Sequence, residues 1–459
     1  MAETTTQDDH EQYDRLSNLP DDILVLILNK LDLLQDAVRT TVLSKRWRHL
    51  SGFRSEIVLD VLNFNTTDYD DSKYTIDEMV RTNASVVQAT KTILQQNCQH
   101  IIELLSITFY LRDESVGIVR SVDETMANKK ILKAEFTILP EVLVDAVDCT
   151  DDDMLACGTR FMTLFDAYPR AFGGLTDLSL YSLRLGESDI PNVLSTCKKL
   201  VYLNLENCDA GFGSILQIEH SQLVELIMDL CAFGSVELKW LPNLTYLTCK
   251  NWLPSEDQYP LSLGHVPQLS MLNLSNGSTR AQHKTIELSE LLGNAIIGKL
   301  DLDFQCERIW IQPERPKHVA LQNLRVVTLC SIREEYGLMW TLFILEAAPL
   351  LNELNMEVSY HLCYSDEEDE YNYNDESTRE MYQKAAHLLK WETRHDFKHC
   401  NMRNLGIVGF QIEEKFTRYI RRVMQAAVNL ERVSLLESRP CLRCECLPST
   451  VHGLNRREI

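Results

Sequence analysis

The chain has 459 residues, of which 45% are apolar and 24% charged, an ordinary composition for a globular protein of two or three domains. Its formal net charge of −22 argues against nucleic acid or an anionic membrane as the main partner, because phosphate binding depends on a basic surface. No apolar run reaches the length that a bilayer-spanning helix needs. The fourteen cysteines and the absence of a signal-peptide core predict reduced thiols and a cytoplasmic or nuclear location.

The first 13 residues are polar and predict a disordered tail, and three short helices are expected within residues 14–55. The first helix begins after Pro20, with two aspartates at its positively polarised end. Its apolar residues at helical spacing are Ile23, Leu24, Ile27, Leu28 and Leu31, and Val25 and Leu26 are apolar as well. Three helices of this size cannot bury that much apolar surface in one small core, so the pattern predicts a partner. The alternative is a helical cap that packs on a larger domain of the same chain.

The stretch LSNLPDDILVLILNKL, followed by DAVRTTVLSKRWR, resembles a plant F-box domain. This resemblance implies that the helices bind the Skp-type adaptor of a Skp–cullin–F-box ubiquitin ligase and, through the adaptor, the cullin ligase. It also implies that seven residues face the adaptor or hold that face together: Leu19, Pro20, Ile23, Leu24, Leu28, Val42 and Trp47. The basic residues beside Trp47 (Lys45, Arg46 and Arg48) are either a solvated rim or a means of steering the adaptor.

Residues 56–165 contain three apolar strands, at 57–62, 101–111 and 131–139, and are interpreted as a linker with N-terminal repeats. A leucine-x-x-leucine-x-leucine pattern then recurs through residues 166–360. Its members are Leu175-Leu178-Leu180, Leu200-Leu203-Leu205, Leu223-Leu226-Met228, Leu244-Leu247-Cys249, Leu269-Leu272-Leu274, Ile297-Leu300-Leu302, Leu324-Val327-Leu329 and Leu351-Leu354-Met356. Starts 21 to 28 residues apart are typical of leucine-rich repeats, in which each strand buries its alternate residues against its neighbours. The predicted fold class is therefore α/β: a three-helix F-box, then a solenoid with parallel strands on its concave face and helices on its convex face.

The repeats pause at 361–378, where SDEEDEYNYNDES carries seven carboxylates and predicts a disordered acidic insert. Residues 379–459 have a net charge of +6, against −28 for the rest of the chain. Strands are expected at 400–410 and 430–435, with an amphipathic helix at 412–428 between them. This order resembles the FBD region that closes many plant F-box/leucine-rich-repeat proteins, and physically it would cap the last repeat.

Two motifs suggest chemistry, both weakly. The segment from Gly293 to Lys299 spells most of a phosphate-binding loop, but Leu300 stands where a magnesium-binding Ser or Thr is needed, and Leu300 belongs to the repeat pattern. The candidate zinc ligands are Cys441, Cys444, Cys446 and His452. The simpler interpretation is ordinary thiols, because the chain also uses cysteine as a small apolar residue at ladder positions such as Cys208.

The expectation is a non-catalytic substrate receptor without a cofactor, which holds an adaptor through its F-box and an unknown protein substrate through its repeats. Nucleic acid and membrane are not expected as partners. The second hypothesis is a leucine-rich-repeat scaffold that has no ligase attached. The third is a nucleotide- or zinc-dependent enzyme. Exposed aromatic residues near strand ends (Trp240, Trp252 and Trp310) are either recognition residues or core filling.

Overall fold

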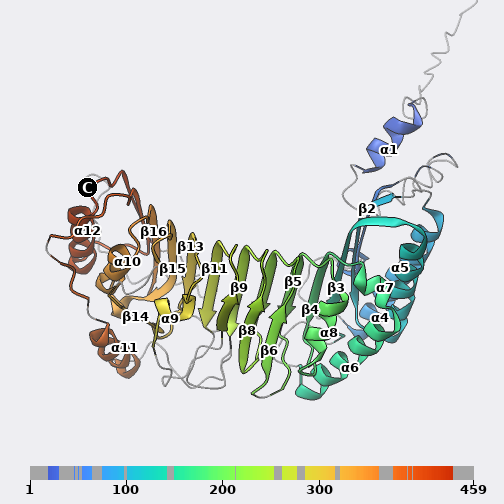
Figure 1. Cartoon of the computed structure of the whole chain (residues 1–459), viewed down its shortest axis with the longest axis horizontal. Coiled ribbons are helices and arrows are strands. Elements are labelled where there is room, and N and C mark those ends of the chain that lie inside the picture. The colour runs from blue at the N-terminus through green and yellow to red at the C-terminus, as the bar shows by residue number, and fades with distance from the viewer. Residues whose placement is uncertain are drawn as a thin grey trace, which may run out of the picture. The chain divides into compact units, whose positions relative to one another are not determined.

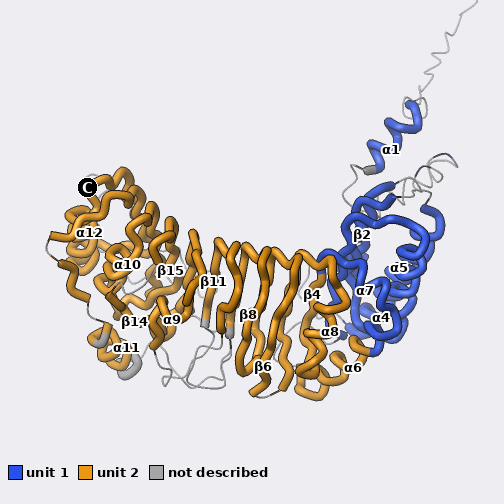
Figure 2. The backbone as a smooth tube through the Cα atoms, in the orientation of Figure 1, with its two compact units in different colours: residues 1–148, 163–177 blue, residues 149–162, 178–459 orange. Residues whose placement is uncertain are grey.

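The computed structural model describes residues 19–29, 46, 50, 54–64, 75–97, 101–141, 149–211, 213–252, 261–276, 285–315, 321–360, 376–389, 391–394 and 396–437. Figure 2 colours its two compact units, the first made of residues 1–148 and 163–177 and the second of residues 149–162 and 178–459. The domain boundaries expected from the sequence are not tested by this division and stay predictions. Among the described helices, none is both long and apolar enough to cross a bilayer.

The first unit contains a parallel sheet with the strand order β1-β2-β3. Its strands are β1 (Glu56–Asp60), β2 (Ile101–Tyr110) and β3 (Lys130–Leu139), as the sequence predicted. Its helices are α1 (Asp21–Asn29), η2 (Val61–Phe64), α4 (Ile76–Gln96), η3 (Asp113–Ser115), α5 (Val116–Asn128) and α7 (Pro169–Gly173). Helix α6 (Asp151–Ala167) divides its residues between the two units.

Alternate residues of β2 and β3 form the core of the first unit. Phe109 packs edge-to-face on Phe136 with ring centroids 5.6 Å apart, and Phe136 packs in the same way on Phe172 of α7 at 5.7 Å. Helix α4 contacts β1 and β2, and it starts with a capping box between Thr75 and Glu78. The period of two in the strands thus builds one hydrophobic face, and the helices cover it.

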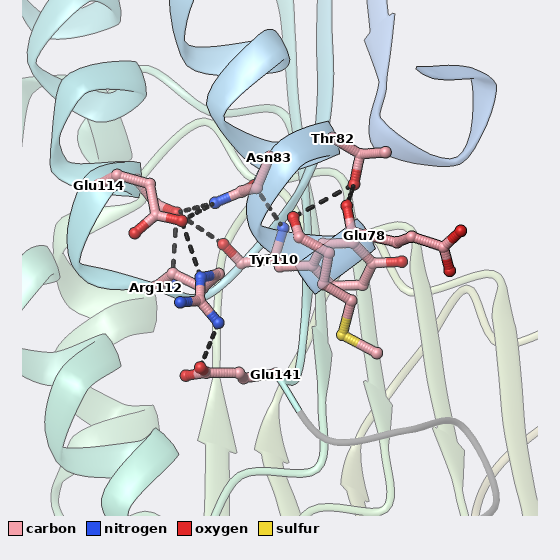
Figure 3. A network of polar contacts seen from close by, with 9 residues as sticks. Glu78, Thr82, Asn83, Tyr110, Arg112, Glu114 and Glu141 are labelled. Atoms are coloured by element: carbon pink, nitrogen blue, oxygen red, sulfur yellow. Dashed lines mark hydrogen bonds and ion pairs between the residues drawn. The ribbon is translucent and has the colours of Figure 1, made fainter. Parts of the chain in front are cut away.

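A buried polar network joins α4 to the end of β2 (Figure 3). The Asn83 Oδ1 atom accepts a hydrogen bond from the Tyr110 backbone N–H at 3.1 Å, and Asn83 Nδ2 donates to Ser115 Oγ at 3.0 Å. Beside it, Arg112 Nε donates to Glu114 Oε1 at 2.7 Å. Because these polar groups form hydrogen bonds with one another, the network has a structural role and fixes α4 against the end of β2.

The second unit is built on a long parallel sheet, called the main sheet below. Its strand order is β4-β5-β7-β9-β11-β13-β15-β16-β17-β18. Figure 1 shows the strands from β4 to β16 side by side, coloured from green to orange. Their bounds are β4 (Asp177–Tyr181), β5 (Tyr202–Glu206), β7 (Glu225–Asp229), β9 (Tyr246–Trp252), β11 (Met271–Asn276), β13 (Lys299–Asp303), β15 (Val326–Arg333), β16 (Glu353–Ser359), β17 (Asn404–Val408) and β18 (Arg432–Leu436). Each predicted repeat contributes one strand, and its three ladder residues are buried, which confirms the leucine-rich-repeat solenoid.

The layer behind the main sheet differs in one respect from the predicted helical layer. Helices fill it at the two ends of the unit: α8 (Asp189–Thr196), α9 (Leu288–Leu292), η5 (Glu334–Tyr336), η6 (Met339–Thr341), α10 (Leu342–Ala347), α11 (Glu376–Leu388) and α12 (Glu414–Ala426). Strands fill it in the middle repeats: β6 (Ile215–Glu219), β8 (Ser235–Trp240) and β10 (Leu261–His265) form one sheet, and β12 (Ile286–Glu287) and β14 (Ile311–Gln312) form another. For β6 and β8 the physical reason is that they lie in the two shortest repeats, of 23 and 21 residues, and that they alternate apolar and polar residues with a period of two.

Two buried histidines join consecutive repeats in the second unit. The His220 Nε2 atom donates to the carbonyl of Cys197, the last residue of the α8 turn, at 3.1 Å, and His399 Nε2 donates to the carbonyl of Ala348, after α10, at 2.9 Å. In both rings Nδ1 accepts a backbone N–H two or three residues further on. Burial lowers the pKa of both histidines, so the neutral ring is the form that this geometry holds.

The predicted strand–helix–strand order at the end of the repeats is confirmed as β17, α12 and β18. Helix α12 buries Phe416, Tyr419 and Val423 on one face, and its Glu414 and Arg418, four residues apart, form an ion pair with 2.7 Å between Oε1 and Nη2. The acidic stretch up to residue 375 lies outside the described residues, so the prediction made for it stays a prediction.

Candidate functional site

The first candidate surface is the exposed side of α1. The helix starts immediately after Pro20, and the Leu24 backbone N–H donates to the Pro20 carbonyl at 3.1 Å. Asp21 and Asp22 occupy the first turn, where carboxylates complement the helix dipole. Proline, which has no backbone N–H, costs nothing at this position, and the helix start is therefore fixed by local sequence alone.

Helix α1 divides its apolar residues between two faces. Leu24 and Leu28 are fully buried and form a cluster with Leu50 from a later segment, and Leu19, Val25 and Ile27 pack partly against it. On the other face Ile23 is 38% exposed and Leu26 is 57% exposed, although both are large aliphatic residues. The described cluster thus contains only residues between 19 and 50, and it leaves an apolar pair uncovered.

Arg46 fixes the start of α1 to the third predicted helix. Its Nη2 atom donates to the Leu19 carbonyl at 2.6 Å, and its Nε atom donates to Asp21 Oδ1 at 2.7 Å. Arg46 therefore positions Leu19 and Pro20, a structural role that neither of the two sequence interpretations included.

The sequence-based site residues fall into three groups. Leu24 and Leu28 lie in the core of the helical unit, and Pro20 and Ile23 lie at its surface, with Leu19 half-buried between them. Val42 and Trp47 lie outside the described residues. Leu26 was noted in the sequence only as surplus apolar surface; its position three residues after Ile23 was the signal that both lie on one face.

The second candidate surface is the open face of the main sheet, which consists of the residues that alternate with the buried ladder. The register aligns them in two rows over seven strands, from β5 to β16, and in a third row that register shifts interrupt between β9 and β11 and between β15 and β16. The first row is Tyr202, Glu225, Tyr246, Met271, Lys299, Val326 and Glu353. The middle row is Asn204, Ile227, Thr248, Asn273, Asp301, Thr328 and Asn355. The terminal row is Glu206, Asp229, Lys250, Ser275, Asp303, Cys330 and Glu357.

The open face is strongly acidic. Its three rows carry seven carboxylates and two lysines. Lys299 Nζ pairs with Asp301 Oδ2 at 3.0 Å. Within the described residues, by contrast, the terminal-row carboxylates Glu206, Asp229 and Asp303 form no ion pair.

Negative charges of the terminal row act on one another. The pKa of Glu206 is raised by burial and by the carboxylate of Asp229, which the register places on the neighbouring strand. The pKa of the Cys330 thiol is raised to about 11 by burial and by Asp303 and Glu357, while Lys250 acts in the opposite direction. Like charges on adjacent strands are destabilising. Part of this cost is offset by Lys250 beside Asp229, by the Asn251 amide, which donates to Asp229 Oδ1 at 2.7 Å, and by the Gln305 N–H, which donates to Asp303 Oδ1 at 2.8 Å.

The backbone after the first strands holds the terminal row in place. Ser182, Asn207 and Leu230 follow β4, β5 and β7 with φ of 55°, 51° and 53°, the left-handed region. The Asn207 N–H donates to the Asp229 carbonyl at 2.8 Å, and the Leu230 N–H donates to the Lys250 carbonyl at 3.2 Å. The ladder of hydrogen bonds therefore continues beyond the strands and fixes the spacing of the row.

The structure also bears on the motifs that suggested chemistry. The lysine and leucine of the phosphate-loop-like segment, Lys299 and Leu300, lie in β13, and helix α9 comes before the segment, whereas a phosphate-binding loop joins a strand to a following helix. The four candidate zinc ligands lie outside the described residues, and among the described residues no group of three or more His, Cys, Asp or Glu side chains could hold a metal.

Cysteine and tryptophan positions support packing roles. Cys208, Cys231 and Cys249 are fully buried, and burial raises the pKa of their thiols. Trp310 is buried beside Phe304, with ring centroids 6.0 Å apart, whereas Trp240 is exposed at the end of β8. The side chain of Trp252 lies outside the described residues.

A stack of parallel strands with a buried leucine ladder defines the class of leucine-rich-repeat proteins, here with a separate helical segment at the N-terminus. Comparisons with known proteins agree. The family model described as At1g61320/AtMIF1, LRR domain, matches residues 167–454, and the F-box domain model matches residues 16–54. The chain therefore belongs to the plant F-box/leucine-rich-repeat proteins.

Three relatives from Arabidopsis thaliana carry the F-box in their names, two of them together with FBD. The chain is 23% identical over 358 residues to FBD-associated F-box protein At5g56370, with 76% of each chain covered. It is 27% identical over 217 residues to putative FBD-associated F-box protein At5g50270, covering 47% of this chain and 51% of the relative. It is 41% identical over 71 residues to F-box protein At1g80960, covering 14% of each. The chain thus spans about half or less of the length of two of these relatives.

Proposed function

We propose that the chain is the substrate-recognition subunit of a Skp–cullin–F-box ubiquitin ligase. The observation that carries the proposal is the F-box match at residues 16–54 together with the uncovered apolar pair on α1. Burying the exposed parts of the two side chains, 38% of Ile23 and 57% of Leu26, contributes about 1.5–3 kcal/mol in total before ordering costs, and the exposed Pro20 adds to the surface. The partner on this surface is a Skp-type adaptor.

The repeats supply the second contact. A row-ordered sheet face presents side chains from seven strands at fixed spacing, and such a face suits recognition of another protein. The chain acts by proximity: holding a substrate next to a ubiquitin-conjugating enzyme raises the effective concentration of its lysines. No bond chemistry is required of the chain itself.

Coexpression with a Skp-type adaptor tests the proposal. The wild-type chain is expected to copurify with the adaptor, and Leu19→Ala combined with Pro20→Ala is expected to abolish copurification. A double variant that keeps the adaptor, with the same yield of folded protein, contradicts the proposed surface. A wild-type chain that never captures an adaptor supports the second hypothesis, a leucine-rich-repeat scaffold without a ligase.

A further inference from the structure

The open face of the main sheet presents an excess of negative charge: its three rows hold seven carboxylates and two lysines, of which Lys299 pairs with Asp301 and Lys250 lies in register with Asp229. Glu206 and Asp229 are paired in register, while Asp303 and Glu357 follow at the same end of later strands, beyond register shifts, and both act on Cys330. None of the four forms an ion pair among the residues that the structure describes. Two other buried or half-buried acids of the unit are paired: Asp209 accepts from Arg184 Nε at 2.7 Å, and Glu335 accepts from Arg333 Nε at 3.2 Å.

Buried polar atoms of the neighbouring row point to the same need. Asn204 is 7% exposed and Thr248 is 4% exposed, yet Asn204 Oδ1 and Thr248 Oγ1 have no hydrogen-bond partner. Asp301 Oδ1 in the same row is also buried and without a partner. Two of these three atoms can only accept, and the third can accept as well. A buried acceptor without a donor is costly, so an outside N–H or O–H group that these side chains turn to meet recovers part of that cost.

The two rows have the dimensions of an extended peptide. Seven strands at about 4.8 Å spacing span about 29 Å. An extended chain rises about 3.3 Å per residue, so about nine residues cover the rows. The carboxylates are spread along this length and do not converge on one point, and no described group of side chains is placed to hold a metal ion.

The negative charge of the open face decides which kind of ligand it can bind. A second copy of this chain carries a net charge of −22 and is repelled, and so is nucleic acid. A lysine- or arginine-rich segment places cations against the terminal row and presents backbone and side-chain N–H groups to the middle row.

We propose, building on the proposed function, that the open face of the main sheet binds an extended segment rich in lysine and arginine from the substrate protein. The terminal row (Glu206, Asp229, Asp303 and Glu357) receives the cations, and Asn204 and Thr248 of the middle row receive hydrogen bonds. Affinity and discrimination then come mainly from charge, with the fixed strand spacing setting which cations are reached together.

A labelled peptide of nine alternating lysines and threonines tests the surface on the full-length chain, by fluorescence anisotropy at an ionic strength of about 0.15 M. The test variant combines Glu206→Gln, Asp229→Asn, Asp303→Asn and Glu357→Gln, in which the amides keep the size and hydrogen-bond acceptors. The control variant combines Asp152→Asn, Glu187→Gln, Glu219→Gln and Glu290→Gln, exposed acids off the open face. Both variants change the net charge by the same amount.

The wild-type chain is expected to bind the peptide, the test variant to bind at least about tenfold more weakly, and the control variant to stay within about twofold of wild type. Thr248→Val, which removes one orphan hydroxyl at constant volume, is expected to weaken binding about threefold without lowering thermal stability. Equal losses in the test and control variants overturn the proposal, because they reveal non-specific attraction. Binding that appears only after deletion of residues 438–459 also overturns it, since the chain's own segment is then the occupant.

Adaptor capture by the same preparations separates this proposal from the proposed function. A wild-type chain that captures the adaptor but does not bind the basic peptide overturns the surface and leaves the ligase role. A wild-type chain that binds the peptide, with loss only in the test variant, but captures no adaptor supports the surface and overturns the ligase role.

Discussion

The exposed face of α1 and the open face of the main sheet differ in chemical character: the first is apolar and the second is negatively charged. On α1, the apolar side chains of Ile23 and Leu26 are 38% and 57% exposed. On the sheet, carboxylates outnumber lysines, and buried acceptors lie without donors. The first surface therefore requires a partner with complementary apolar shape, and the second requires a partner with complementary charge. One chain can thus hold a constant partner and a selected one without the two competing for a surface.

The largest expected effect is a difference in stability cost between substitutions on the buried face and on the open face of the main sheet. Leu272 and Met271 are neighbours on β11, and Leu272 is fully buried while Met271 belongs to the open face. Leu272→Ala is expected to lower the free energy of unfolding by about 2–5 kcal/mol, because it leaves a cavity in the ladder. Met271→Ala is expected to cost less than about 1 kcal/mol. Denaturant unfolding measures both; equal costs would mean that the open face is part of the core and is not a binding surface.

Next in size is the loss of the apolar surface on α1. Ile23→Glu combined with Leu26→Glu is expected to weaken adaptor capture at least about 100-fold, because two carboxylates would be buried at an apolar interface. Ile101→Glu combined with Leu132→Glu, at exposed aliphatic positions of the first unit's sheet, is the matched control and is expected to leave capture unchanged. Titration of the adaptor by calorimetry gives both affinities. If the control loses as much affinity as the α1 variant, the surface has been misplaced.

A smaller effect on stability is expected at Thr248, a buried residue in the middle row of the open face. Thr248→Val removes a buried hydroxyl without a partner and keeps the side-chain volume. The free energy of unfolding is expected to rise by about 1 kcal/mol, measured by urea unfolding. Thr245→Val is the control, because the Thr245 hydroxyl donates to the Val224 carbonyl at 3.2 Å and its removal should not stabilise. If neither substitution stabilises the chain, the Thr248 hydroxyl forms a hydrogen bond with water and its removal brings no gain.

The smallest expected effect is the pH dependence of the repeat junctions, which lie away from both surfaces. His220 and His399 have pKa values lowered by burial, so below the ordinary histidine pKa of 6.5 the unfolded chain takes up protons that the folded chain does not. The stability that these residues contribute is complete above pH 6.5 and is lost as the pH falls from there toward their folded pKa values. The unfolding midpoint is expected to fall between pH 7 and pH 5.5, and to fall less in His220→Gln combined with His399→Gln. An unchanged slope in the double variant contradicts this assignment.

Sequence alone predicted those features that depend on spacing along the chain. The leucine ladder, the strand–helix–strand order of β17, α12 and β18, and the start of α1 at Pro20 all follow from local periodicity or capping. The strands β6 and β8 were missed because helices were expected behind every repeat, although their alternation indicates strands. Which apolar residues of α1 are buried depends on Leu50, and the sequence does not say which face Leu50 covers.

The open face could not be predicted, because its rows arise from register. Glu206 and Asp229 are 23 residues apart and become neighbours only when β5 and β7 pair. Charge counts over the whole chain gave the sign of the surface but not its location. Likewise, the orphan state of Asn204 Oδ1 is a property of packing, and no sequence pattern encodes it.

Salt dependence of the two interactions, measured on one preparation of the wild-type chain, tests the contrast between the surfaces most directly. Adaptor capture is expected to change less than about twofold between roughly 0.05 and 0.5 M salt, whereas binding of the basic peptide is expected to fall at least about tenfold. Two affinities that fall in parallel, or a peptide affinity that does not respond to salt, would contradict the assignment of an apolar surface to α1 and an electrostatic one to the sheet.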